Sequence, residues 1–191
     1  EDMKIEVSYD TSVFIDKAVH EVYVTLGIAM GLVVLVIYAF LGSLRATLVP
    51  AVAVPVSLIA TFMVLYALGF TINLLTLLAL VLAIGLVVDD AIVVLENVVR
   101  RMREENEPPL LAAYRGTRQV GFAVVATTLV LVAVFVPITF LEGDVGRLFS
   151  EFAVTLAAAV SFSGLVALTL TPMLASKILR QNAKSDGKTT L

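Results

Sequence analysis

The sequence predicts an all-α membrane protein: a bundle of five transmembrane helices with a short external strand-like segment at its N-terminus. The 191 residues are 60% hydrophobic with a mean hydropathy of +1.02, against an apolar share of roughly 45–50% in soluble domains. Five apolar runs are each long enough to cross a bilayer, which takes about 20 residues. The centres of these runs contain no Lys, Arg or His.

The five runs are expected to span the membrane at residues 22–41, 48–70, 72–99, 119–140 and 149–179. Pro50 lies near the start of the second run, where its missing N–H does little harm. Pro55, Pro137 and Pro172 lie deeper and should bend their helices locally. The last run is longer than a bilayer requires, so one end of it should extend into water.

The remaining segments complete the expected domain organisation. Residues 1–21 alternate like a strand from Met3 to Tyr9 and then continue as a helical lead-in, so they are expected to end an external domain. Residues 22–180 are the transmembrane bundle, and residues 181–191 are a polar cytoplasmic tail. Since the chain begins with neither Met nor a signal peptide, it is expected to be part of a longer polypeptide.

Two local patterns predict smaller features. Pro108 and Pro109 precede an amphipathic stretch, which should form a short helix at the membrane interface. Several glycines within the runs are expected to permit close packing between helices. These glycines are Gly27, Gly31, Gly85 and Gly164.

The distribution of basic residues predicts the orientation. Five spans place the two termini on opposite sides of the membrane, with ten Lys and Arg on the C-terminal side and three on the other. The ten are Arg45, Arg100, Arg101, Arg103, Arg115, Arg118, Lys177, Arg180, Lys184 and Lys188; the three are Lys4, Lys17 and Arg147. The positive-inside rule therefore places the C-terminus in the cytoplasm and the N-terminus outside.

Asp89 and Asp90 stand side by side within the apolar run 74–95. A charged residue in the middle of a membrane helix costs roughly 2.5–3.5 kcal/mol, and proton relays and ion pathways are its commonest uses. Because desolvation and mutual repulsion oppose two negative charges, the pair should take up and release a proton near neutral pH. The alternative is a structural polar cluster, in which the aspartates hydrogen-bond to neighbouring helices.

Helical spacing predicts that the aspartates lie on a stripe of small and polar residues. Steps of seven connect them to Thr76, Leu82, Ala83, Glu96 and Asn97. This stripe should face protein, and any counter-charge must come from residues outside this chain. The opposite side suits lipid or apolar packing and carries Leu77, Val81, Ile84, Val88 and Leu95. If the chain stands alone, the aspartate stripe should be exposed.

Other site classes find little support. Cysteine is absent, which excludes disulfides and thiolate metal sites, and no cofactor, metal site or nucleic-acid partner is expected. His20 is a lone histidine at the outer edge of the first run, where an interfacial polar role is expected. An intramembrane aspartyl protease needs two acids from different helices around a water and a peptide, which neighbouring residues on one helix do not provide. We therefore do not expect an enzyme.

The stretch GFTINLLTLLALVLAIGLVVDDAIVVLENVVR resembles the signature helix of the resistance–nodulation–division superfamily. The closest resemblance is to its hydrophobe/amphiphile efflux branch, the drug-exporting inner-membrane pumps of Gram-negative bacteria. FLGSLRATLVPAVAVPVSLI, AVFVPITFLEG and ALTLTPMLASKIL also agree, and YDTSVFIDKAVHEV is similar to the segment that leads from the external porter domain into the second helix. The resemblance extends to about Arg180 and implies helices two to six of twelve.

This resemblance implies efflux of hydrophobic or amphiphilic compounds by drug/proton antiport, driven by the proton-motive force, with Asp89 and Asp90 as the proton relay. It implies basic partners in a second half that this chain lacks and drug binding in the absent porter domain. It also implies a multi-pass inner-membrane protein in contact with lipid, with a periplasmic N-terminus, that forms a homotrimer with a periplasmic adaptor and an outer-membrane channel. The alternative function is a non-transporting five-span scaffold or a sterol-sensing-type module.

Overall fold

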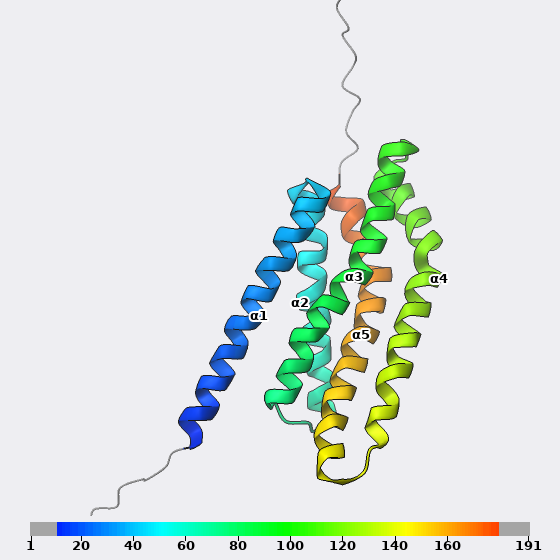
Figure 1. Ribbon diagram of the computed structural model, residues 1–191. Helices are drawn as coiled ribbons and strands as arrows, with labels where there is room; N and C mark the ends of the chain where they lie inside the picture. Colours follow the sequence, from blue (N-terminus) through cyan, green and yellow to red (C-terminus); the bar gives the residue numbers. More distant parts are fainter. Residues whose placement is uncertain (1–10, 180–191) are drawn as a thin grey trace, which may run out of the picture.

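The computed structural model describes residues 11–179, which form five long helices that run up and down beside one another (Figure 1). They are α1 Thr11–Leu41, α2 Leu44–Ala67, α3 Leu74–Glu104, α4 Pro109–Phe135 and α5 Gly143–Ile178, with the short 3-10 helix η1 Val136–Phe140 after α4. All five are long and apolar enough to cross a membrane, so the predicted all-α membrane protein with five spans is confirmed. The predicted N-terminal strand and the tail 181–191 lie outside the described residues.

Helices α3 and α5 form the centre of the bundle. Helix α5 packs against α2, α3 and α4, whereas α1 contacts α2 and α3 along one edge (Figure 1). Half of the apolar segments of α3 and α5 is buried, against 6% in α1 and in α4. The outer helices therefore leave most of their apolar surface for lipid or for further protein.

The stretch after Pro108 differs from its predicted form. No separate interfacial helix is present in the described chain: Pro109 is the first residue of α4, which continues unbroken to Phe135. The reason is tertiary, because Ala112 and Ala113 are fully or almost fully buried in a cluster with α3 residues such as Leu95. Small side chains on this face allow α4 to pack on α3 instead of lying flat on the membrane.

Ion pairs hold the connection between α3 and α4. The Glu107 carboxylate accepts hydrogen bonds from Arg115 Nη1 at 2.7 Å and from Arg101 Nη1 at 3.3 Å. Arg101 also pairs with Glu105 at 2.8 Å. The hydrogen bond from Arg115, aided by the charge of both arginines, holds the pKa of Glu107 below its ordinary value. The Glu107 carboxyl therefore loses its proton at a lower pH than an ordinary glutamate does.

The glycines divide into two groups. A Cβ added at Gly27, Gly31 or Gly85 would meet no atom within 4 Å, so these three do not mediate close packing within the described chain. At Gly164, on α5, an added Cβ would lie 2.5 Å from the Thr128 hydroxyl oxygen on α4. The prediction of a close helix contact is therefore confirmed at Gly164 alone of these four.

We expect Gly164→Ala to weaken the packing of α4 on α5. The new methyl group would also lie 3.4 Å from Thr128 Cβ and Cγ2, and a β-branched side chain has few rotamers into which it can move. Overpacking of this kind costs typically about 1–3 kcal/mol. Gly121→Ala is the matched control, because its Cβ would make only an ordinary 3.8 Å contact with Leu168 on α5. Reversible unfolding in mixed micelles measures both variants, and equal stability of the two would contradict this account.

Candidate functional site

The start of α3 is fixed by a capping box. The Asn73 side-chain oxygen accepts hydrogen bonds from the backbone N–H groups of Leu75 and Thr76, each at 2.9 Å. In return, Thr76 Oγ1 accepts from the Asn73 backbone N–H at 2.9 Å. Asn73 also donates to the Glu151 carboxylate on α5. This arrangement satisfies the first N–H groups of α3 and joins it to the helix that faces Asp90.

Asp90 is half-buried between α3 and α5. Its Oδ2 accepts a hydrogen bond from Ser163 Oγ at 2.8 Å, and Ser163 is 1% exposed. The same Ser163 oxygen lies 3.0 Å from the backbone carbonyl oxygen of Val87, one turn before Asp90. The prediction that the pair faces protein is therefore confirmed for Asp90.

Asp89 is exposed in this chain and lines an open groove between α3 and α4. The groove has a volume of about 530 Å³. Its other lining residues are Leu86, Asp90 and Val93 from α3, and Ala123, Val124, Ala126, Thr127, Val130 and Leu131 from α4. Of these residues, only Asp89 and Asp90 can titrate. The Thr127 hydroxyl lies within hydrogen-bond distance of the backbone carbonyls of Ala123 and Val124, on its own helix.

The predicted stripe on α3 divides into two lines. The Asp90 line is buried at Thr76, Ala83 and Asn97, as the prediction that it faces protein requires. The Asp89 line is exposed at Leu82, Asp89 and Glu96, as the expectation for the isolated chain requires. On the opposite side Leu77, Ile84, Val88 and Leu95 are buried against other helices, so packing, not lipid, covers that side.

The contact between Asp90 and Ser163 can exist in two hydrogen-bonding states. A serine hydroxyl carries one hydrogen, so it donates either to Asp90 or to the Val87 carbonyl, but not to both. An ionised Asp90 accepts that hydrogen. A protonated Asp90 can instead donate to Ser163 Oγ, which then donates to Val87. The geometry therefore allows one proton on Asp90 to change a bond between α3 and α5.

Sequence reasoning did not find Ser163. Its sequence signal is weak: Ser161 and Ser163 interrupt an apolar run beside Gly164. Ser161 instead donates to the carbonyl of Ala157 on its own helix. His20 is exposed, and the described residues contain no group of three His, Cys, Asp or Glu side chains placed to hold a metal ion.

Five membrane helices, an acidic pair on a central helix and a helix–helix contact at one of the acids define a multi-pass membrane protein with an intramembrane titratable site. The model of the AcrB/AcrD/AcrF family matches residues 1–190. The chain therefore belongs to the AcrB/AcrD/AcrF family. This membership confirms the resemblance to resistance–nodulation–division efflux pumps. Together with the five apolar helices, it also supports the prediction of a multi-pass inner-membrane protein.

Several relatives are about half identical to this chain. An uncharacterized transporter of Haemophilus influenzae is 51% identical over 182 residues, which are 95% of this chain and 18% of the relative. Multidrug resistance protein MdtC of Erwinia tasmaniensis is 52% identical over 179 residues, 94% of this chain and 17% of the relative. MdtC of Yersinia enterocolitica is 51% identical over 186 residues, which are 97% of this chain and 18% of the relative. The chain thus spans less than a fifth of the length of these relatives, which are named as transporters and multidrug resistance proteins.

Proposed function

We propose that this chain is part of the proton-translocating membrane domain of a drug/proton antiporter. In this proposal the proton-motive force drives export of hydrophobic or amphiphilic compounds, and Asp89 and Asp90 are the proton relay. The observation that carries the proposal is that the two acids lie in different surroundings in this chain, which belongs to a family of efflux pumps. Asp90 bonds to α5 through Ser163, while Asp89 lies on an open groove.

The two placements support different roles. Asp89 and Asp90 are the only titratable residues of the α3–α4 groove, so an approaching cation would meet both carboxylates there. A cation near Asp89 favours loss of a proton from the pair, and its withdrawal favours proton uptake. The proton state of Asp90 then changes the Ser163 hydrogen bond and therefore the contact between α3 and α5. Proton transfer and helix movement are coupled in this way without any cofactor.

The remaining parts of the pump come from outside these 191 residues. We propose that a helix of the same longer polypeptide covers the α3–α4 groove and supplies a Lys or Arg to the aspartates. The N-terminus is periplasmic and the C-terminus cytoplasmic in this proposal, as the basic residues indicate. The complete transporter is a homotrimer that works with a periplasmic adaptor and an outer-membrane channel and takes hydrophobic small molecules.

Reconstitution of the full-length transporter that contains this segment tests the proposal. In proteoliposomes with an imposed proton gradient, transport of an amphiphilic dye should be accompanied by proton flux in the opposite direction. A protonophore, which collapses the proton gradient, should reduce dye transport to the level of protein-free vesicles. Transport that continues after the gradient has collapsed would show that proton exchange does not drive the pump.

A further inference from the structure

We infer that Glu96 is the carboxylate through which protons pass from the Asp89–Asp90 pair to the cytoplasm, along a groove between α1 and α3. This inference rests on the proposed proton relay and adds its outlet. Glu96 and Asp89 share one exposed line of α3, seven residues apart. That spacing is two helical turns, or about 10.5 Å.

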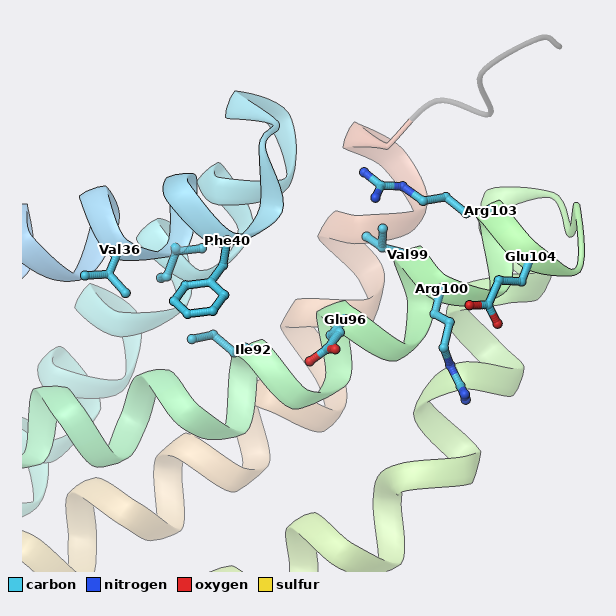
Figure 2. Close-up of a pocket in the computed structure, with 9 residues that line it drawn as sticks. Val36, Phe40, Ile92, Glu96, Val99, Arg100, Arg103 and Glu104 are labelled. Carbon is cyan, nitrogen blue, oxygen red and sulfur yellow. The ribbon is translucent and has the colours of Figure 1, made fainter.

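Glu96 lines a second groove, which is separate from the one at Asp89. This groove has a volume of about 570 Å³ and lies between Val36, Ile37 and Phe40 of α1 and the C-terminal half of α3. Figure 2 shows Phe40 reaching from α1 toward α3, with Ile92 and Glu96 beside it on α3. Arg103 and Glu104 line the end of the groove where α3 ends. An open groove therefore extends from the end of the bundle that carries most of the arginines to Glu96, just past the apolar run 74–95.

Glu96 has no hydrogen-bond or ion-pair partner among the side chains that the structure describes. A structural glutamate at this position has an obvious partner in Arg100, because a Glu four residues before an Arg is a favourable helical pair. Arg100 instead donates to Asn97 Oδ1 at 2.8 Å, and Asn97 donates to the Gly116 carbonyl of α4 at 2.7 Å. Figure 2 shows the Arg100 side chain directed away from α1. The expected ion pair is therefore absent here, and the Glu96 side chain is exposed in the described chain.

The charges around Glu96 come from α3 alone. The α1 wall of the groove contributes only apolar side chains, and the charged residues of the lining are Glu96, Arg100, Arg103 and Glu104. A separation of about 10.5 Å along the helix exceeds a hydrogen bond, so a proton from the aspartate pair reaches Glu96 through intervening water. The proton then leaves the Glu96 carboxyl for water in the groove, and the carboxylate is restored for the next proton.

Three variants of the full-length transporter test this outlet. Glu96→Gln should lower proton-driven dye transport by roughly 100-fold, the lower end of what a positioned proton-transfer group contributes. Its residual transport should no longer change with cytoplasmic pH. Glu96→Asp keeps the carboxyl group and should restore most of the rate and the pH response. Glu105→Gln, at a half-exposed carboxylate just past the end of α3, should transport at the parental rate.

The outcomes separate this inference from the proposed function. Parental transport by Glu96→Gln together with an inactive Asp90→Asn would overturn the outlet and leave the relay intact. Parental transport by both variants would overturn the proposed function itself. If Glu96→Gln and Glu96→Asp fail equally, or if Glu96→Gln does not accumulate as folded protein, Glu96 is structural and the inference is wrong.

Accessibility of position 96 gives an independent test. This segment contains no cysteine, so Glu96→Cys and Leu95→Cys can be compared in a full-length transporter whose other cysteines are removed. In inverted vesicles, a small membrane-impermeant thiol reagent should label position 96 from the cytoplasmic face. The neighbouring Leu95 is fully buried, so Leu95→Cys should not react. Failure to label position 96 would mean that water does not reach the groove, and the outlet would be excluded.

Discussion

Asp89→Asn and Asp90→Asn should each abolish drug efflux by the full-length transporter while leaving its amount and assembly near parental levels. An amide has nearly the size of a carboxylate but cannot cycle a proton, so the proposed relay should stop at either position. At position 90 the amide oxygen can still accept the Ser163 hydrogen bond that Asp90 accepts at 2.8 Å. The helix packing should therefore survive while the function is lost.

Dye accumulation in cells that lack other efflux pumps measures this loss directly. Each aspartate variant should accumulate dye to the level of cells without the transporter, and immunoblots and crosslinking should show parental amounts and assembly of the protein. The Glu105→Gln variant serves again as the surface control. Efflux close to the parental rate in either aspartate variant would remove that residue from the relay and favour a structural polar cluster.

Thiol labelling should show opposite results on the two sides of the membrane. A cysteine at Glu105, in the link between α3 and α4, should react with an impermeant reagent only after the cells are permeabilised. A cysteine at Glu142, in the link between η1 and α5, should react in intact outer-membrane-permeable cells. This expectation follows from the ten-to-three distribution of Lys and Arg. We choose Glu142 over the adjacent Gly143 because Gly143 has φ +89°, where a side chain is strained.

Reaction at Glu105 in intact cells, with Glu142 protected, would reverse the orientation. The groove at Glu96 would then open to the periplasm, so the inferred direction of proton release would be wrong as well. Equal reaction at both positions in intact cells would indicate damaged membranes. A cysteine at the buried Leu95 should not react in any preparation, so its labelling would reveal unfolded protein.

Hydropathy predicted the apolar part of each helix but not the residues at which the helix begins and ends. Helix α1 begins at Thr11, eleven residues before the predicted span, and α3 continues five residues past the predicted end at 99. Polar residues in these extensions remain helical because the helix is held by its own backbone hydrogen bonds, which do not require apolar side chains. A hydropathy pattern therefore does not record where the helix ends. Similarly, the stretch after Pro108 has an amphipathic pattern that suits the membrane surface and a neighbouring helix equally well. Only the burial of Ala112 and Ala113 against α3 shows which of these it uses.

The sequence predicted the part of the candidate site that lies on α3 but not the part that lies on α5. Asp89 and Asp90 are conspicuous because carboxylates are costly in an apolar run, and helical spacing correctly joined Asp90 to the buried Thr76 and Ala83. Ser163 is 73 residues from Asp90 in the chain, and a serine in a membrane helix is not unusual. Its pairing with Asp90 depends on how α3 crosses α5, which no periodicity within either helix contains.

Helix α5 extends far beyond the contact between Ser163 and Asp90. Its 36 residues extend about 54 Å, whereas the hydrocarbon layer is about 30 Å thick. Ser163 lies 20 residues from the first residue of α5, Gly143, a distance of about 30 Å along the axis. The helix has no proline between these two points, since Pro172 lies on the other side of Ser163. If the proposed proton relay tilts α5 at Asp90, a rigid segment of this length would turn that tilt into a larger displacement at the Gly143 end of the helix.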